Sequence, residues 1–383
     1  MGGLPAVGQI LTRYLPITGN WIYEQLRRLT RHRAVVITRA TENLASFPVS
    51  AVHSLADQPA LGRAWNRAAG AARGYMPFQL NAARAERVQL LHAHFGPAGA
   101  RAVPLAKALS VPLVTSFYGY DLGRHRAGRE GLRRKYAALF RSGAAFVVEG
   151  PVAAERLLAL GCPPERVIVH RLGVDLERLP YRLRSRCQGD PLRVLMAARF
   201  TEKKGLEYGL EAVCVAIESG ARLTVTIVGG PGPTAEDRAI ERRLHGIVTR
   251  HVVADAVRFT GPVDHDEFRR LLYEHHVFLQ PSVEASTGDC EGGLPIALIE
   301  AAASGMPLIG TWHSDIPDLV RGGETGWLCE ERDVHGLVDA LAEAAAPGGR
   351  LTELGAGARR RVEETFDLRR GSLDDVYQRV LRA

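Results

Sequence analysis

Several features that mark other classes of protein are scarce or missing in this sequence. Its 383 residues include only five cysteines and no Cys-x-x-Cys pair, which argues against a disulfide framework or a structural zinc site. No apolar run approaches the roughly 18 residues that cross a bilayer. The N-terminus lacks the basic stretch and apolar run of a signal peptide. We therefore expect a cytoplasmic protein.

The motifs of common cofactor and metal enzymes are missing too. There is no P-loop lysine and no His-Glu-x-x-His helix, and the run 229–232 (GGPG) does not match Gly-x-Gly-x-x-Gly. The string Asp264-His265-Asp266 is similar to a metal-binding Asp-x-Asp. However, Asp264 followed by Glu267 is a good helix-capping pair. We therefore expect no metal and no cofactor.

Charge is unevenly distributed along the chain. Residues 1–180 carry 24 Lys+Arg against 11 Asp+Glu, a net charge of +13, and the remainder carries 25 against 31, a net of −6. Two basic clusters lie in the first half: Arg27, Arg28, Arg31 and Arg33, then Arg124, Arg126, Arg129, Arg133, Arg134 and Lys135. They are either solvated helix faces or a surface attracted to anionic lipid on the inner face of the membrane. Nucleic acid is disfavoured, because no motif for it accompanies the charge.

The order of elements predicts an α/β fold. Strands alternate with helices in two series, which is typical of parallel sheets with helical crossovers. The polar, Arg-rich stretch Tyr181–Asp190 reads as a linker. We predict two Rossmann-like domains, 1–180 and 190–365, facing each other across a cleft, with the C-terminal helix (about 366–383) packing back on the first. Ligands on such sheets bind beyond the carboxyl ends of the strands.

The predicted strands and helices are as follows. The strands are Gln9–Leu15, Val35–Thr38, Leu90–His94, Leu113–Phe117, Ala145–Val148, Leu192–Ala197, Leu223–Val228, Val257–Thr260, Val277–Gln280 and Pro307–Thr311. The helices are Trp21–Leu29, Pro97–Leu109, Pro151–Leu160, Leu206–Ser219, Ala235–His251, Asp266–Glu274, Pro295–Ala303, Val334–Ala345 and Gly371–Leu381. The stretch 57–87 is expected to be helical without clear bounds.

The most informative segment, 288–300 (GDCEGGLPIALIE), follows a strand, passes through glycines and opens a helix. Glycines let the backbone approach a ligand closely, and a helix start presents free N–H groups to it. A carboxylate at Glu300, among apolar neighbours, needs hydrogen-bond donors, and sugar hydroxyls are suitable ones. The alternative is that Glu291 favours the helix N-terminus electrostatically and Glu300 is exposed. The residues alone do not decide between the two.

This segment resembles the E-x7-E signature of family-4 glycosyltransferases, the large retaining group of GT-B fold. One residue is extra here, since eight residues separate Glu291 from Glu300. The resemblance implies that Glu291 contacts the transferred sugar and Glu300 the ribose hydroxyls. The backbone around Gly292, Gly293, Leu294 and Pro295 would reach sugar or phosphate oxygens, and Gly229 and Gly230 are assigned to the same donor site.

A second match, residues 197–205 (AARFTEKKG), lies about 90 residues upstream. It is similar to the family's strand-end Arg and Lys-Gly pair, which implies that Arg199 and Lys204 hold the donor diphosphate. Fixed cations would stabilise the negative charge that grows on the leaving diphosphate. They could therefore replace a divalent metal.

The N-terminal half carries complementary pieces of the resemblance. The stretch 14–21 resembles the family's first loop, which lies against the donor, and places Gly19 and Asn20 there, with Asn20 a good helix-cap candidate. The stretch 116–121 (SFYGYD) matches a motif that usually reads Phe-His-Gly-x-Asp. Tyr118 replaces its histidine and can donate a hydrogen bond but carries no positive charge. His92, His94 and Asp121 are assigned to the acceptor side, although each histidine could equally be a satisfied strand-end residue.

These motifs imply a retaining, metal-independent glycosyltransferase. Its substrates would be a nucleotide diphosphate sugar and a saccharide or lipid-linked saccharide of cell-surface polysaccharide or glycolipid synthesis. In this mechanism the departing phosphate helps to take the acceptor proton, and no protein nucleophile is required. Two alternatives stay open: a sugar-nucleotide epimerase or phosphorylase of the same fold, and a non-catalytic nucleotide-sugar-binding subunit.

Overall fold

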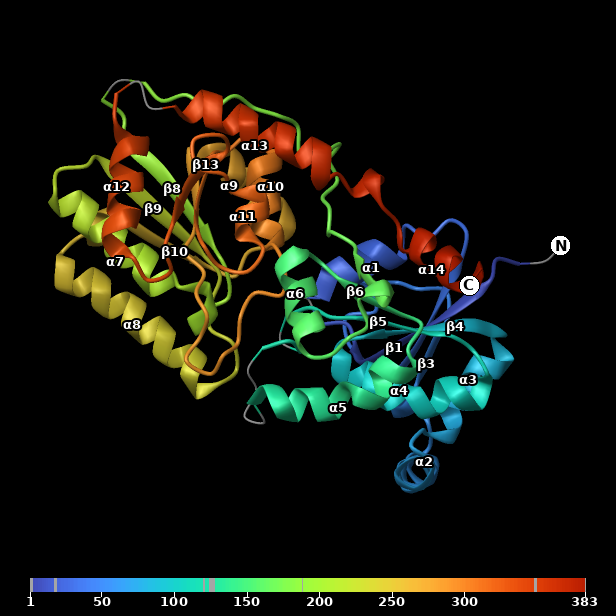
Figure 1. The fold of residues 1–383 in the computed structure, drawn as a ribbon. Helices are drawn as coiled ribbons and strands as arrows, with labels where there is room; N and C mark the ends of the chain where they lie inside the picture. Colours follow the sequence, from blue (N-terminus) through green and yellow to red (C-terminus); the bar gives the residue numbers. More distant parts are fainter. Residues whose placement is uncertain are drawn as a thin grey trace. The chain divides into compact units, whose positions relative to one another are not determined.

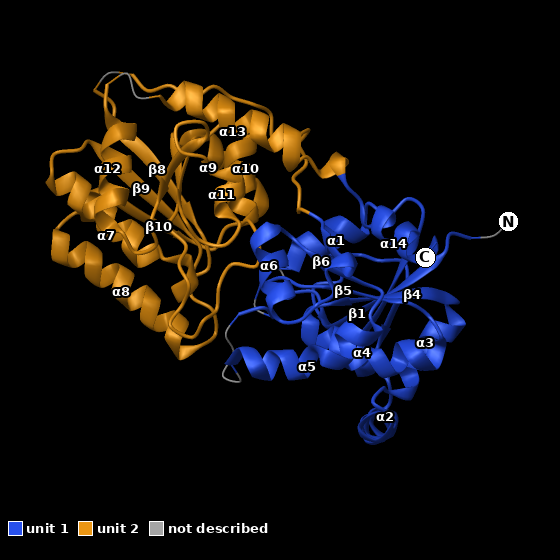
Figure 2. Cartoon of the chain, viewed as in Figure 1, with its two compact units in different colours: residues 1–170, 371–383 blue, residues 171–370 orange. Residues whose placement is uncertain are grey.

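The computed structural model describes residues 3–16, 19–119, 121–123, 128–187, 189–347 and 350–382. Arg124 and Arg126 of the second basic cluster lie outside these ranges. The chain divides into two compact units, one formed by residues 1–170 with 371–383 and the other by 171–370 (Figure 2). Each unit contains a parallel β-sheet flanked by helices (Figure 1).

The sheet of the first unit has seven parallel strands in the order β3-β2-β1-β4-β5-β6-β7. The strands are β1 (Ala6–Tyr14), β2 (Arg33–Thr41), β3 (Val52–Ser54), β4 (Val88–His94), β5 (Leu113–Ser116), β6 (Ala145–Val148) and β7 (Val167–Val169). The chain moves outward from β1 to β3 and then returns to the other side of β1. The strand order therefore reverses between β1 and β4, where Rossmann-like sheets bind ligands.

The helices of this unit are α1 (Asn20–Leu26), α2 (Ala60–Arg73), α3 (Pro77–Ala85), α4 (Gly96–Leu109), α5 (Gly128–Ser142), α6 (Pro151–Ala159) and α14 (Leu373–Arg382). The stretch 57–87 forms two of them because the chain turns at Gly74. This residue has a φ of +79° and ends α2, and Pro77 begins α3. A left-handed glycine after a helix and a proline at a helix start both favour such a break.

The C-terminal helix α14 covers one face of this sheet. Neighbouring strand residues point to opposite faces, so Leu90 and Leu91 belong to different hydrophobic clusters. On the face of Leu90, α14 contributes Leu373, Val376 and Tyr377 to the buried cluster. The last helix thus belongs to the first unit, although about 200 residues separate it from the rest of that unit in sequence.

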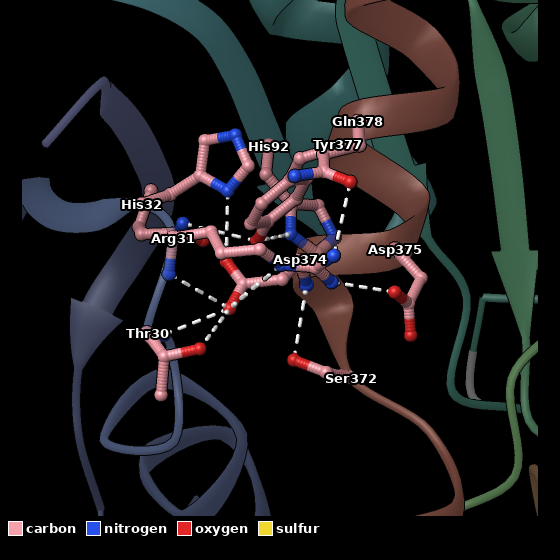
Figure 3. Close-up of polar contacts among 10 residues, drawn as sticks. Thr30, Arg31, His32, His92, Ser372, Asp374, Asp375, Tyr377 and Gln378 are labelled. Carbon is pink, nitrogen blue, oxygen red and sulfur yellow. Dashed lines mark hydrogen bonds and ion pairs between the residues drawn. The ribbon is translucent and has the colours of Figure 1, made fainter.

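A buried carboxylate fixes α14 to the loop before β2 (Figure 3). Asp374 Oδ2 accepts hydrogen bonds from the backbone N–H groups of Thr30 (2.8 Å) and Arg31 (3.1 Å), and Oδ1 lies 2.7 Å from His32 Nδ1. Burial raises the pKa of Asp374. The hydrogen bonds from Thr30, His32 and Arg31 together lower the pKa by more than burial raises it, so it lies below its ordinary value.

Substitution of Asp374 by Asn is expected to lower the free energy of unfolding at pH 7 by about 2–4 kcal/mol, because buried charge-assisted hydrogen bonds are lost. The pKa of Asp374 is lowered in the folded state, so its contribution is complete above the unfolded pKa of about 3.9 and is lost as the pH falls through the folded value. Urea titrations at several pH values measure both effects. The control is Asp375→Asn, since Asp375 pairs with Arg31 on the surface. An equal loss in the two variants would contradict this role.

The second unit has six parallel strands in the order β10-β9-β8-β11-β12-β13. The strands are β8 (Leu192–Ala197), β9 (Leu223–Val228), β10 (Val257–Gly261), β11 (Val277–Gln280), β12 (Leu308–Thr311) and β13 (Gly326–Cys329). The helices are α7 (Leu206–Glu218), α8 (Ala235–His251), α9 (His265–Glu274), α10 (Ile296–Ala303), α11 (Ile316–Leu319), α12 (Val334–Ala345) and α13 (Leu351–Thr365). Here the order reverses between β8 and β11.

The second unit starts about ten residues before the linker predicted at 181–190. Val174, Leu176 and Leu179 are buried in the same hydrophobic cluster as strand residue Leu195. The segment 171–180, which the sequence places in the first domain, therefore packs with the second. The boundary predicted from the Arg-rich stretch 181–190 thus lies about ten residues after the observed one. Burial of apolar side chains, rather than local polarity, sets a domain boundary.

Candidate active site

The predicted cationic and acidic residues of the second unit come from the two strands at which its order reverses. Arg199 and Lys204 follow β8, and Glu291 lies in the loop after β11. These strands are hydrogen-bonded neighbours. Their carboxyl ends therefore lie at one edge of the sheet, where Rossmann-like sheets bind ligands.

Lys204 and Glu291 form a nearly buried ion pair at this edge. Lys204 Nζ lies 2.7 Å from Glu291 Oε1 and 2.9 Å from Oε2. Ser282 Oγ donates to Oε1 at 2.9 Å and itself accepts from Gln280 Nε2 at 2.7 Å. Glu291 is only 6% exposed. The pair thus places a fixed cation and a fixed anion side by side, with the carboxylate oriented by a second donor.

The environment keeps Glu291 ionised. Burial raises its pKa, but the charges of Lys204 and Lys203 and the hydrogen bond from Lys204 lower it more, so the pKa lies below its ordinary value. Its backbone N–H donates to His313 Nε2 at 3.1 Å, and His313 Nδ1 lies 2.6 Å from Glu331 Oε1. A ring nitrogen that accepts a hydrogen bond carries no proton. His313 is therefore neutral here, with its proton on Nδ1, and it holds the Glu291 backbone in place.

Two further contacts hold the loop before Glu291 against the short 3₁₀ helix Glu202–Lys204. Lys203 Nζ donates to Asp289 Oδ1 at 3.2 Å and to the Cys290 carbonyl at 3.1 Å. Glu202 accepts from the backbone N–H and the hydroxyl of Ser286. The two adjacent lysines thus have different partners: Lys203 anchors the loop, and Lys204 contacts the Glu291 carboxylate.

Arg199 lies at the same strand end but is exposed. Within the described ranges its guanidinium forms no hydrogen bond or ion pair with another residue. An exposed arginine beside a charged site is available to a phosphate group, which its planar fork binds in a bidentate manner. Arg199 is thus a cation that follows the same strand as Lys204 and has no partner among the described residues.

Glu300 lies in α10 and is buried, with 7% of its surface exposed. The alternative that it is exposed is therefore wrong. Its Oε1 lies 3.1 Å from His265 Nε2, at the start of α9. His265 belongs to the string dismissed as a metal motif. The preceding residue, Asp264, caps α9, because its side chain accepts a hydrogen bond from the Glu267 N–H at 2.8 Å.

The pair of His265 and Glu300 makes stability depend on pH. The hydrogen bond to Glu300 raises the pKa of His265 above its ordinary value. A raised folded-state pKa gives a contribution that is complete below the unfolded pKa of about 6.5 and is lost as the pH rises through the folded value. His265→Gln is thus expected to lower the thermal midpoint more at about pH 5.5 than at about pH 9. The control is His245→Gln, at an exposed position of α8. A pH-independent difference for the His265 variant would argue against the pair.

The predicted glycines lie where two backbones approach closely or in the loop before α10. Gly229 has a φ of +125°, and a Cβ atom there would lie 1.9 Å from the Ala198 carbonyl oxygen. The neighbouring Gly230 accepts from the Phe200 N–H at 2.9 Å. These contacts tie the end of β9 to the segment that carries Arg199. Gly292, Gly293, Leu294 and Pro295 connect Glu291 to α10, which begins at Ile296.

In the first unit, α1 begins one residue earlier than the sequence indicates. Its N-cap is Gly19, whose N–H donates to the Pro16 carbonyl at 2.8 Å, and Asn20 is already helical. Among the described residues no side chain caps this helix, and Asn20 lies within it, so the prediction that Asn20 is its cap is wrong. The early turn at Pro16 explains the shift.

Tyr118 is linked to a chain of buried polar side chains. Its hydroxyl lies 2.7 Å from His94 Nδ1, and His94 Nε2 lies 3.0 Å from the amide oxygen of Gln9. The Gln9 nitrogen donates to the Tyr377 hydroxyl at 3.2 Å. An amide oxygen only accepts, so His94 carries its proton on Nε2 and accepts from Tyr118 at Nδ1. The Tyr118 hydroxyl, which we expected to donate a hydrogen bond to a ligand, thus already donates to His94.

The same chain returns to Tyr118 through the neighbouring strand. The Tyr377 hydroxyl lies 2.8 Å from His92 Nδ1, and His92 Nε2 lies 2.8 Å from Ser116 Oγ, which is also hydrogen-bonded to Tyr118. The side chains therefore close a ring of hydrogen bonds between β1, β4, β5 and α14. Neither histidine has a free nitrogen, so both are satisfied strand-end residues.

Burial keeps this ring neutral. It lowers the pKa of His94 to about 3 and that of His92 well below its ordinary value, and it raises the pKa of Tyr118. Asp121 is buried, and its two oxygens accept from the backbone N–H groups of Gly96 (2.6 Å) and Tyr118 (2.9 Å). Asp121 thus holds the loop that presents Tyr118, and Tyr118 can offer a ligand only its acceptor oxygen.

The residues that sequence reasoning missed are the partners of the predicted ones. Ser282 and His313 are polar residues buried just after strand ends, and Gln9 is buried in the middle of β1. Buried polar residues are expected to have hydrogen-bond partners. For Ser282 and His313, their position after apolar strands was the available signal. Within the described part of the chain, no cluster of three or more His, Cys, Asp or Glu side chains is arranged to hold a metal ion.

Both units thus carry polar groups at the carboxyl edges of Rossmann-like sheets, as in two-domain nucleotide-binding enzymes. Comparison with known proteins identifies the class. The family model of glycosyltransferase family 4 matches residues 18–178, and that of glycosyl transferases group 1 matches residues 191–346. Relatives named colanic acid biosynthesis glycosyltransferase WcaL are 38% identical over 257 residues in Salmonella typhimurium and 35% identical over 288 residues in Escherichia coli. They match 66% and 73% of this chain.

The chain therefore belongs to the family-4 glycosyltransferases. It spans 60% of the length of the Salmonella relative and 68% of the Escherichia coli one. A structure of HepE from Anabaena in complex with UDP has a TM-score of 0.79 at 15% identity and covers 99% of this chain and 100% of that one. Sucrose-phosphate synthase from Thermosynechococcus elongatus gives 0.74 at 18% identity, with coverage of 99% and 100%. These neighbours and the two parallel sheets confirm the predicted GT-B fold.

Proposed function

We propose that this protein is a retaining glycosyltransferase of exopolysaccharide synthesis that uses a nucleotide diphosphate sugar. The observation that carries this function is the ion pair of Lys204 and Glu291 where the strand order of the second unit reverses. The names of the relatives support a role in exopolysaccharide synthesis. The structures of HepE in complex with UDP and with UDP-glucose support the donor class.

In the proposed mechanism, Arg199 and Lys204 bind the diphosphate and stabilise the charge that grows on it as the bond to the sugar breaks. Glu300 accepts hydrogen bonds from the ribose hydroxyls, since His265 contacts only one of its oxygens within the described residues. Glu291 accepts from a hydroxyl of the transferred sugar. The acceptor hydroxyl attacks the face that the diphosphate leaves, and its proton passes to the departing phosphate oxygen.

The first unit is proposed to contribute backbone groups at Gly19 and Asn20 to the donor site and the Tyr118 oxygen to the transferred sugar. Because the Tyr118 hydroxyl donates to His94, a sugar hydroxyl that contacts Tyr118 has to donate to its oxygen. The reaction requires no metal and no cofactor in this scheme, and we place it in the cytoplasm.

A donor screen tests this function directly. The purified chain is mixed with UDP-, GDP-, ADP- and TDP-sugars, and the thermal midpoint is recorded, because a ligand of the folded state raises it. The sugar that binds is then given to the chain with a panel of saccharide acceptors. Release of nucleotide diphosphate that requires acceptor, with retained configuration in the product NMR spectrum, is the expected result. Binding without turnover would indicate a binding subunit, and turnover without acceptor an epimerase or hydrolase.

A further inference from the structure

One hydrogen-bond donor at the carboxyl edge of the first sheet has no partner. Trp21 lies in the first turn of α1, and its indole Nε1–H is shielded from solvent without an acceptor among the described residues. A buried donor without an acceptor destabilises the free protein, and such groups are rare in folded proteins. The proposed mechanism does not use Trp21, so this N–H needs an explanation of its own.

The indole belongs to an aromatic cluster formed by Trp21, Phe95 and Tyr118. The ring centroids of Trp21 and Tyr118 are 6.1 Å apart in an edge-to-face arrangement, and those of Phe95 and Tyr118 are 4.9 Å apart. All three side chains are partly exposed and pack against the same buried hydrophobic residues. They follow strands β1, β4 and β5, so the cluster lies where the strand order of the first unit reverses.

Phe95 contributes its ring from a strained backbone conformation. Its φ of +75° lies in the region that favours glycine. Hydrogen bonds fix this conformation on both sides, because the Phe95 N–H donates to the Ser116 carbonyl at 2.8 Å and its carbonyl accepts from the N–H groups of Ala98 and Gly99. Strain of this kind persists where the surroundings impose it, and it concentrates at ligand sites. The conformation of Phe95 thus supports a binding role for the cluster.

The polar atoms of the cluster define the group that can bind there. The Trp21 N–H can only donate, whereas the Tyr118 hydroxyl already donates to His94, so that its oxygen can only accept. A hydroxyl group satisfies both, since it accepts from the indole and donates to the phenol oxygen. The apolar C–H groups of a sugar ring suit the partly exposed aromatic rings beside these two atoms.

Nearby charges restrict the sugar further. Burial, and to a smaller extent the charges of Glu149 and Asp121, raise the pKa of Tyr118. A carboxylate on the sugar at this position would be repelled by the same charges, and it has no proton to donate to the phenol oxygen. A neutral sugar with a free hydroxyl avoids both penalties.

We propose that Trp21 is a specificity-determining residue that donates its indole N–H to a hydroxyl of a neutral sugar, and that the same hydroxyl donates to the Tyr118 oxygen. The inference rests on the proposed function, in which Tyr118 contacts the transferred sugar. It adds that this sugar carries a free hydroxyl where it faces the cluster, so that a donor deoxygenated there, or oxidised to a uronic acid, is a poor substrate. Because the N–H is shielded from solvent, the indole has to shift when the sugar enters.

The test uses the full chain, a saccharide acceptor and the nucleotide sugars of the donor screen, with analogues in which each hydroxyl of the transferred sugar in turn is replaced by hydrogen. For wild type, one analogue is expected to lose at least about 100-fold in kcat/KM, because the missing hydroxyl leaves the groups of the site unpaired. Trp21→Phe keeps an aromatic ring and removes the N–H. It should lose at least about tenfold with the parent sugar and discriminate at most about tenfold against that analogue.

A stability measurement separates this role from a structural one. The thermal midpoint of ligand-free Trp21→Phe should lie within about 2 °C of the wild-type value or above it, since the lost N–H has no partner in the free protein. The matched control is Trp65→Phe, which removes an exposed indole from α2 in the same unit. It should keep its rate within about twofold and discriminate as strongly as wild type.

The double variant Trp21→Phe, Tyr118→Phe tests whether one hydroxyl contacts both groups. If it does, the double variant should be little worse than the more impaired single variant, and losses that multiply would overturn the shared hydroxyl. Should Trp21→Phe fail to fold, the same loss of discrimination is expected in Tyr118→Phe.

Two further outcomes separate this inference from the proposed function. Full discrimination in Trp21→Phe, or a wild type that accepts every deoxygenated analogue, would overturn the inference alone, because sugar transfer itself would have been observed. A wild type that releases no nucleotide diphosphate with any donor and acceptor would contradict the proposed function, and the role of Trp21 would fall with it.

Discussion

Replacement of Glu291 by Gln is expected to lower the rate of sugar transfer at least about 100-fold, with little change in affinity for the nucleotide diphosphate. The substitution preserves shape but removes the charge that Lys204 and Ser282 orient. If Glu291 contacts the transferred sugar, its charge matters most when positive charge develops at the anomeric carbon. The loss should therefore be seen in kcat, and nucleotide affinity should be retained.

Initial rates over a range of donor concentrations measure this effect, and a thermal shift with free nucleotide diphosphate reports the affinity. Asp289→Asn is the matched control, because Asp289 lies in the same loop and pairs with the neighbouring Lys203. We expect that variant to keep its rate within about tenfold, as it removes a partly exposed ion pair. A Glu291 variant that turns over as fast as wild type would end the assignment of this carboxylate to the sugar.

The parts of the fold that the sequence predicts best are those with strong local signals. Strands β8, β9 and β11 and helices α8 and α12 have the predicted bounds, because apolar runs or helical periodicity end at clear breaks. The strands that were missed, β3, β7 and β13, have only three or four residues and lie at the edges of the sheets. Helices α5 and α13 were missed because arginines and glycines interrupt the apolar periodicity of their sequences.

In the candidate site too, features with a strong local signal were predicted and those without one were not. Arg199, Lys204, Glu291 and Glu300 could be found because each lies in a short motif next to a strand end. The pairing of Lys204 with Glu291 could not be predicted, because this contact spans 87 residues and depends on β8 and β11 being neighbours. A contact across that distance follows from sheet topology, which local patterns do not encode.

The ring of hydrogen bonds around Tyr118 is the feature that the sequence predicts least. It joins residues from Gln9 to Tyr377, and its last member reaches it only because α14 returns to the first unit. The sequence pointed to His92, His94 and Tyr118 as polar residues at strand ends. It could not indicate that each is saturated by the others, because hydrogen-bond direction depends on the orientation of one buried amide.

Replacement of Lys204 by Ala is expected to be at least as damaging, again about 100-fold or more in the rate of transfer. It removes a cation from the proposed diphosphate site and also leaves the Glu291 carboxylate buried without its counter-charge. Unlike the Glu291 variant, it should weaken nucleotide diphosphate binding, because Lys204 would contact the diphosphate in the ground state as well. Lys203→Ala is the matched control, as that lysine anchors the loop through Asp289 and Cys290.

The pH dependence of the Lys204 variant gives a sharper test, because it separates the two roles of this lysine. The charge of Lys204 helps to keep the pKa of Glu291 below its ordinary value against the opposing effect of burial. Without it the pKa of Glu291 should rise, and the residual activity should fall as the pH decreases through that higher value. The double variant Lys204→Ala, Glu291→Gln should lack this dependence and be less impaired than the two single losses multiplied together, since the residues act as a unit. If the losses instead multiply, the two side chains work independently, and the ion pair is only a structural contact.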